Sequence, residues 1–272
     1  MKVKGASAPY LVWMVIFIVV PLFLVVFFAF TDSSGAFTFD NILKIGQYSN
    51  VFLRSVWLGA IATVISFVLG YPMAYIISKI DVKKQSIMIM LIMLPMWMNF
   101  LLRTYAWMSL LEDTGLINQF LKLLGFEPVH MINTAGAVVL GMVYNYLPYM
   151  VLPIYSILTK MDGSVIEAAQ DLGANNTKVF LKVVFPLSLP GVISGITMVF
   201  VPSVSTFIIS KMLGGGGNLL IGDLIDMQFL GNAYNPNLGS AISLVLMILI
   251  LLCMGIMNQF DDGDNTEGGI MP

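Results

Sequence analysis

The chain has 272 residues, of which 58% are hydrophobic and only 10% are charged, and its formal net charge is −2. Soluble domains carry about 25% charged residues, so this composition excludes a water-soluble globular protein. We therefore expect a membrane protein.

Apolar runs of about 20 residues are needed for a helix to cross roughly 30 Å of hydrocarbon. Six such runs lie at 10–30, 56–78, 86–110, 135–158, 187–209 and 238–257. The first run exceeds the roughly 7 to 15 residues of a signal-peptide core, so we expect it to be retained. The sequence thus predicts an all-α polytopic protein with six transmembrane helices. These form one domain, residues 1–258, followed by an acidic tail, 259–272, that we expect to be disordered.

Basic residues set the orientation, because loops rich in lysine and arginine resist translocation. With the N-terminus inside, eight lie in cytoplasmic segments: Lys2, Lys4, Lys79, Lys83, Lys84, Lys160, Lys178 and Lys182. Five lie outside or near the outer face: Lys44, Arg54, Arg103, Lys122 and Lys211. We therefore expect both termini in the cytoplasm.

Arg103 follows the start of the third run by about 17 residues, which places it near the outer boundary of the membrane. One interpretation is a side chain that snorkels to the headgroups. The other is a gate or an ion pair with Glu112 or Asp113.

An amphipathic helix is predicted after this run, since Leu116, Ile117, Phe120, Leu121 and Leu124 recur at helical spacing. Asp113 and Thr114 are its expected caps, and Gly125 is its expected end. We expect this helix to lie flat at the outer surface.

The polar stretch at 164–186 carries its own helix signals. Ser164 and Glu167 have the spacing of a capping box, which predicts a helix beginning near Val165. Gly173 stands where a left-handed residue ends a helix. Asn176 and Thr177 signal a second helix start, and Pro186 is expected to stop that helix.

The glycine run at 214–217 predicts a flexible external loop. The residues after it, NLLIGDLIDMQF, predict a short helix or a re-entrant turn.

Catalytic motifs are absent from the sequence: it has no GxSxG, no HExxH and no P-loop. We therefore expect a protein that is not an enzyme and that carries no cofactor. Cys253 is the single cysteine, so an internal disulfide is excluded. His130 has no second imidazole or carboxylate at ligand spacing in the sequence, so we expect no metal site.

The pattern of the polar stretch resembles the EAA loop of permease subunits in ATP-binding-cassette importers. Its matching residues are Glu167, Ala168, Ala169, Gly173, Val183, Phe185 and Pro186. The resemblance implies that 159–186 is a cytoplasmic coupling loop, and that its helix, 164–173, sits in a cleft of an ATPase subunit. The residues that it assigns to this coupling are Ser164, Glu167, Ala168, Ala169, Asp171, Gly173 and Pro186.

Further stretches narrow the resemblance to spermidine/putrescine permease subunits, particularly those of the PotB type. These stretches are 69–79, 94–107, 146–156, 167–174 and 215–230. The likeness implies a type I importer permease in the bacterial cytoplasmic membrane. It also implies a second, homologous permease chain, two ATP-binding subunits that bind ATP and magnesium, and an external polyamine-binding protein. We expect no nucleic-acid partner.

A polyamine crossing a low dielectric needs carboxylates or aromatic faces along its route. The carboxylate candidates for the pathway are Glu112, Asp113, Asp223 and Asp226, and Asp32 is a further one. The other candidates are Arg103 and the aromatic residues Trp97, Tyr105, Trp107, Tyr144, Tyr146 and Tyr149. The same aromatic residues would also suit an interfacial belt.

The mechanism that we hypothesise is a rigid-body movement of helix 164–173, driven by closure of the ATPases and passed to the pore by spans four and five. One alternative is the same class of importer with another cargo, such as ferric iron, sulfate or a sugar. A second alternative is a secondary transporter or channel that works alone. An intramembrane enzyme has less support, because the sequence offers no recognisable pair of nucleophile and base.

Overall fold

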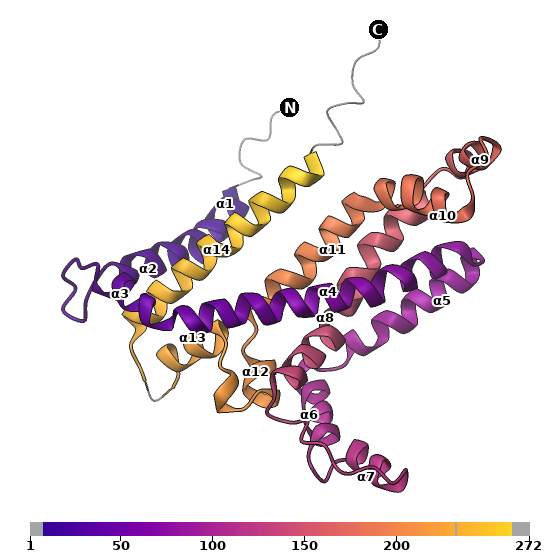
Figure 1. Cartoon of the computed structure of the whole chain (residues 1–272). Helices are drawn as coiled ribbons and strands as arrows, with labels where there is room; N and C mark the ends of the chain where they lie inside the picture. Colours follow the sequence, from indigo (N-terminus) through magenta and orange to yellow (C-terminus); the bar gives the residue numbers. More distant parts are fainter. Residues whose placement is uncertain (1–7, 232, 263–272) are drawn as a thin grey trace.

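A computed structural model describes residues 8–231 and 233–262. Figure 1 shows an elongated bundle of helices, with the short helices α9 and α10 at one end and the pair α6 and α7 projecting near the other. The described part of the chain is helical, apart from loops and one isolated β-bridge between Thr31 and Phe37.

The helices follow one another along the whole described chain. The first half holds α1 Ala8–Met14, α2 Val20–Ala29, α3 Asp40–Lys44, α4 Ser49–Lys79, α5 Val82–Met93, α6 Phe100–Leu111 and α7 Leu116–Leu123. The second half holds α8 Ala135–Lys160, α9 Gly163–Asp171, α10 Asn176–Val179, α11 Phe185–Ser205, α12 Ile208–Leu213, α13 Ile221–Phe229 and α14 Pro236–Asp262. The predicted fold class is confirmed.

Among the described residues, five helical stretches are long and apolar enough to cross a membrane by themselves. They are Pro9–Ala29, Asp40–Lys79, Ala135–Lys160, Asn176–Ser205 and Pro236–Met257. A sixth span exists only if Val82–Trp97 and Phe100–Leu123, which meet at an angle of 87°, count as one. The continuous third span predicted at 86–110 is therefore wrong.

The break in the third span has a local cause. Leu94–Trp97 forms a 3-10 turn that includes Pro95, and Met98 is extended. The side chain of Asn99 then accepts a hydrogen bond from the amide of Leu101 at 2.8 Å, which starts α6 in a new direction.

The start of the fifth span also differs from the prediction. Pro186 does not stop a helix, because the helical stretch runs on from Asn176 to Ser205. A π-helical turn, Phe180–Val184, comes directly before α11 and shifts the hydrogen-bond register. Pro186 lies in the first turn of α11, directly after this π turn, so the helix accommodates its ring without ending.

Helices α4, α8 and α11 form the centre of the bundle and pack against one another. Both neighbours approach α8 at Met150, which is completely buried. A Cβ on Gly70 of α4 would lie 2.9 Å from Met150, and one on Gly195 of α11 would lie 2.8 Å from its sulfur. Small residues at these crossings allow the close packing on which membrane helix bundles depend.

Two segments that were expected to lack regular structure, the glycine run and the beginning of the C-terminal tail, are partly helical. The glycine run continues as a 3-10 turn, Gly216–Asn218, whose Gly217 carbonyl accepts a hydrogen bond from Arg54. The predicted short helix after the run is confirmed as α13. At the C-terminus, α14 continues to Asp262, four residues into the segment 259–272, whose assignment as a separate tail stays a prediction. Residues 263–272 of that tail lie outside the described residues.

Candidate functional site

The segment predicted to be the coupling loop, residues 159–186, begins at the end of α8 and contains helix α9. Its N-cap is Asp162, whose carboxylate accepts a hydrogen bond from the amide of Ser164 at 2.9 Å. The predicted capping box of Ser164 and Glu167 is therefore wrong, and the helix begins at Gly163. Hydrogen bonds from Ser164 lower the pKa of the Asp162 carboxyl, since they favour its charged form.

The end of α9 follows the prediction closely. Gly173 has a φ of +81°, in the left-handed region that favours glycine. Its amide donates to the carbonyl of Gln170 at 2.8 Å, and the amide of Ala174 donates to the carbonyl of Ala169 at 3.1 Å. These two bonds make a Schellman motif, which fixes the bend after α9.

The second helix start lies one residue earlier than predicted. The side chain of Asn175 accepts a hydrogen bond from the amide of Lys178 at 2.9 Å and so caps α10. The predicted sequence of helix, tight bend and second helix is confirmed, and it places α9 at the end of the bundle (Figure 1).

Helix α9 has one packed side and one exposed side. Ile166 and Ala169 pack against the hydrophobic cluster that includes Val179 and Val184. The exposed side presents Ser164, Glu167, Ala168 and Asp171, and the helix ends at Leu172, which is 90% exposed. The packed side thus joins α9 to the start of the fifth helical stretch, Asn176–Ser205.

The pathway carboxylates on α13 are both engaged within the chain. Asp223 is only 3% exposed, and its Oδ2 accepts a hydrogen bond from the amide of Leu220 at 2.8 Å. Its Oδ1 is buried without a partner, and burial raises the pKa of this carboxyl. Asp226 pairs with Lys211 at 2.9 Å, which raises the pKa of the lysine. Asp32 is likewise occupied, since its Oδ1 accepts hydrogen bonds in a turn.

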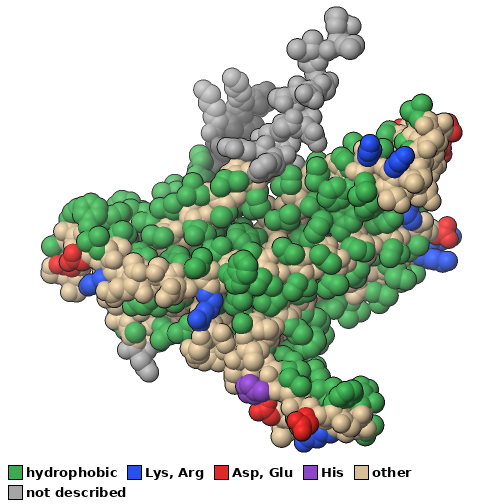
Figure 2. Space-filling model, in the orientation of Figure 1, with side chains coloured by type: hydrophobic (Ala, Val, Ile, Leu, Met, Phe, Trp, Pro, Cys, Tyr) green, Lys and Arg blue, Asp and Glu red, His purple; other side chains and the backbone are tan. Residues whose placement is uncertain are grey.

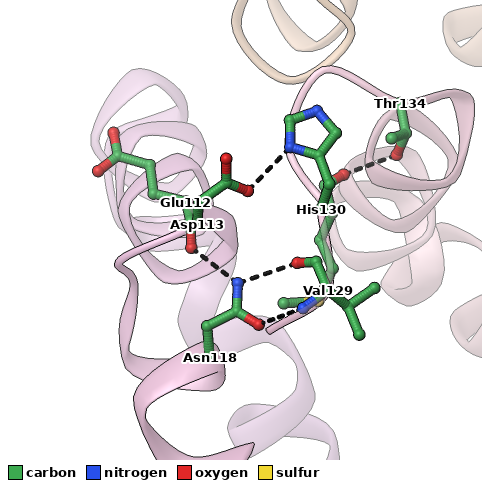
Figure 3. A network of polar contacts seen from close by, with 7 residues as sticks. Glu112, Asp113, Asn118, Val129, His130 and Thr134 are labelled. Carbon is green, nitrogen blue, oxygen red and sulfur yellow. Dashed lines mark hydrogen bonds and ion pairs between the residues drawn. The ribbon is translucent and has the colours of Figure 1, made fainter. Parts of the chain in front are cut away.

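The other two carboxylates lie in the α6–α7 arm, residues 98–134, which Figure 3 shows from close by. Asp113 contacts His130 at 2.8 Å, and both side chains are exposed. The fold thus supplies the carboxylate neighbour of His130 that the sequence spacing did not reveal. Glu112 is exposed. No group of three ligands suited to a metal ion occurs among the residues that the structure describes.

Asn118 holds the arm together and was not predicted, because a lone amide within an apolar helical pattern gives no signal. It is fully buried. Its amide group donates to the Val129 carbonyl at 2.9 Å, and its carbonyl accepts from the Val129 amide at 2.8 Å (Figure 3).

The pathway aromatics divide into exposed and packed rings. Trp97, Tyr105 and Tyr149 are exposed. Trp107 meets Tyr144 edge to face at 5.3 Å, and both Trp107 and Tyr146 pack against a buried hydrophobic cluster.

Arg103 is 8% exposed, and its guanidinium lies 5.9 Å from the ring of Phe100. Its Nε and Nη1 are buried without a hydrogen-bond partner. The predicted snorkelling and the predicted ion pair are therefore wrong in this structure, whereas a role of Arg103 as a gate stays a prediction. The side chain does not snorkel, and the described residues include no ion pair between it and Glu112 or Asp113.

Comparison with known proteins gives a consistent result. Residues 5–262 match the family described as "Binding-protein-dependent transport system inner membrane component". The chain is 36% identical over 250 residues to the "Spermidine/putrescine transport system permease protein PotB" of Haemophilus influenzae, covering 88% of this chain and 87% of that protein. It is also 36% identical over 255 residues to the protein of that name from Escherichia coli K12, covering 90% and 91%.

Solved structures show the same fold. A bacterial ABC transporter involved in the import of the acidic polysaccharide alginate matches with a TM-score of 0.80 at 14% identity, over 93% of this chain and 92% of that chain. The MetNI methionine ABC transporter, in an inward-facing conformation, matches with a TM-score of 0.58 at 15% identity, over 79% and 94%. At these identities the likeness concerns the fold alone.

Proposed function

Because this chain belongs to the family of binding-protein-dependent transport system inner membrane components, we propose that it is a permease subunit of an ATP-driven polyamine importer. It forms half of the pathway, and a second, homologous permease chain forms the other half. The polyamine cargo is supported by the 36% identity to two permeases named for spermidine and putrescine, which extends over about nine-tenths of the chain.

The proposed orientation has both termini in the cytoplasm. Charged side chains gather at the ends of the molecule in Figure 2, whereas apolar side chains cover most of the face between them. Lysines 160, 178 and 182 flank α9 and α10, which supports placing this end on the cytoplasmic side.

We propose that two separate cytoplasmic ATPase subunits bind ATP and magnesium and drive transport. The exposed side of α9, with Glu167, Asp171 and Leu172, docks in a cleft of one subunit. When the ATPases close, α9 moves as a rigid body, because the Schellman motif at Gly173 and the packing of Ile166 and Ala169 resist bending. An external polyamine-binding protein delivers the cargo.

The pathway has to accommodate a polycation, and the candidate residues differ in whether their side chains are accessible to it. The exposed rings of Trp97, Tyr105 and Tyr149 offer faces for cation–π contacts. Asp226 is paired with Lys211, and Asp223 is buried with one oxygen bonded to the Leu220 amide, so these carboxylates contact cargo only if their present surroundings open.

Uptake measurements test the proposal directly. Cells without polyamine uptake of their own, expressing the complete importer, are expected to accumulate radiolabelled spermidine or putrescine. The matched control lacks only the ATPase subunit and should accumulate neither. Accumulation of ferric iron, sulfate or a sugar instead would identify one of the other cargoes, and flux through the purified chain alone would indicate a stand-alone transporter.

A further inference from the structure

The turn between α4 and α5 is held by one buried side chain, Gln85. Its Nε2 donates to the carbonyl of Ile80 at 2.8 Å and to that of Ser78 at 3.3 Å. Carbonyls at the end of a helix have no partner within the helix. Gln85 therefore binds the end of α4 to the start of α5, and the two helices form one hairpin.

The same amide also reaches α8. Its Oε1 accepts a hydrogen bond from the hydroxyl of Tyr155 at 2.8 Å. Tyr155 lies in the last two turns of α8, immediately before the coupling loop. Gln85 thus connects the α4–α5 hairpin to the span that leads into α9.

A cavity of about 400 Å³ lies beside this contact, between the hairpin and the start of α9. Its lining includes Gln85, Thr159 and Ile166. The hydroxyls of Ser78 and Thr159 already donate to backbone carbonyls, and both donors of Gln85 are used. A bound anion would thus find Lys79 as its main donor, so the space suits movement of α9 better than a ligand.

A second contact provides a contrast. The Tyr71 hydroxyl on α4 bonds to Ser188 Oγ on α11 at 2.9 Å, and the serine in turn donates to the carbonyl of Phe185. Tyr71 is surrounded by the rings of Phe67, Phe180 and Phe185. This contact is enclosed by packed rings, whereas that of Gln85 and Tyr155 borders a cavity.

We propose that Gln85 and Tyr155 are positioning residues that transmit the tilt of α8 and α9 to the α4–α5 hairpin. Nucleotide-driven movement then reaches this hairpin in addition to the fourth and fifth spans. The proposal rests on the function proposed above. When α9 moves into the cavity, the hydrogen bond keeps the hairpin in step with α8. Without it, the hairpin lags and hydrolysis proceeds without import.

The test uses the complete importer in proteoliposomes and measures ATP hydrolysed per spermidine imported. Tyr155→Phe and Gln85→Met should each raise this ratio about fivefold, the equilibrium equivalent of one hydrogen bond. The double variant should match Gln85→Met, because once Gln85 is replaced the Tyr155 hydroxyl has no contact left to lose. Tyr71→Phe, which also removes one buried hydroxyl contact between spans, should leave the ratio unchanged.

Melting temperatures of the purified complexes separate coupling from stability. A ratio that follows the melting temperature across all the variants would overturn the proposal. So would additive effects of the two substitutions, or a normal ratio in Tyr155→Phe. If the unaltered complex itself imports no polyamine on adding ATP, the proposed function fails instead, and the variants are not needed to show it.

Discussion

Helices α9 and α7 are short, lie far apart in the molecule (Figure 1) and end in the same way. Gly173 and Gly125 both have positive φ, of +81° and +86°. After α7, the amide of Gly125 donates to Lys122 at 3.0 Å and that of Phe126 to Leu121 at 2.9 Å, which repeats the Schellman motif of α9. The local chemistry that ends the two helices is therefore equivalent.

Their exposed faces differ. Helix α9 presents Glu167, Gln170 and Asp171 to its surroundings. Helix α7 instead exposes an apolar stripe: Leu116, Phe120, Leu123 and Leu124. Its charged and polar neighbours lie outside this stripe, and Figure 2 shows apolar side chains together at the end of the arm. The comparison teaches that the same backbone motif can end two short helices whose exposed surfaces differ in chemistry, polar on α9 and apolar on α7, so we expect different partners for them.

Gly173→Val should have the largest effect. No atom lies within 4 Å of the added Cβ, so the substitution acts only through the left-handed backbone that a β-branched residue disfavours. We expect normal membrane insertion but a loss of coupled uptake of about tenfold, within the usual range of coupling energies.

Gly125→Val is the matched control, because its backbone is equally left-handed and its surroundings are equally open. Spermidine uptake should remain within about twofold of the unaltered importer, since α7 takes no part in ATPase coupling and surface substitutions usually have small effects. Equal losses in the two variants would remove the distinction between the helices.

Asn118→Ala should loosen the arm without unfolding the bundle. It leaves the buried polar groups that Asn118 satisfies without partners, at a local cost of about 1–3 kcal/mol. Hydrogen exchange of the Val129 amide should become faster, whereas Gln119→Ala, on the exposed side of the same helix, should not change it. Unchanged hydrogen-exchange protection of the Val129 amide in Asn118→Ala would mean that the hydrogen bonds of Asn118 do not hold the arm together.

The position of α7 in the membrane can be tested with fluorophores attached to Leu123→Cys and Gln119→Cys in a Cys253→Ser background. Leu123 is 83% exposed within the apolar stripe, whereas Gln119, one helical turn earlier, is polar and lies at the edge of the stripe. Interfacial helices bury their apolar face about 5–10 Å into the headgroup boundary. Lipid-borne nitroxides should therefore quench position 123, and aqueous iodide should quench position 119. Protection of position 123 from both quenchers would indicate a protein partner instead.

The smallest effect concerns pH. Hydrogen bonds from Ser164 lower the pKa of Asp162 in the folded state, so the cap stabilises α9 fully above the pKa of the unfolded chain, about 3.9. The stabilisation is lost as pH falls through the lower, folded value. Hydrogen-exchange protection at the start of α9 should hold from neutral pH to about 5, after correction for the intrinsic exchange rate, and decline below 4. Asp162→Asn, which keeps a capping oxygen, should be much less sensitive.

Much of the fold was predictable because its signals are local. Apolar runs must be long enough to cross the bilayer, and this length requirement alone locates five spans. The ends of α9 and α7 at Gly173 and Gly125 were equally predictable, because few residues other than glycine tolerate a left-handed backbone.

The predictions failed where two local signals competed. Asp162 and Ser164 both suit an N-cap, and the choice of Asp162 moved the start of α9 by two residues. Pro186 reads as a helix stop, but the π turn before it makes it part of a helix start. Spacing alone cannot resolve such cases, because packing against the rest of the bundle decides which alternative is lower in free energy.

By itself, the sequence determined that this is a helical membrane protein with a short helix that ends at Gly173 in a polar stretch, since composition and backbone sterics act over a few residues. Only the tertiary structure decided the burial of Arg103 and the contact of Gln85 with Tyr155. Each of these joins residues that are distant in the chain or depends on what surrounds them. No pattern along one segment encodes such a meeting, because its free energy arises only when the helices have packed.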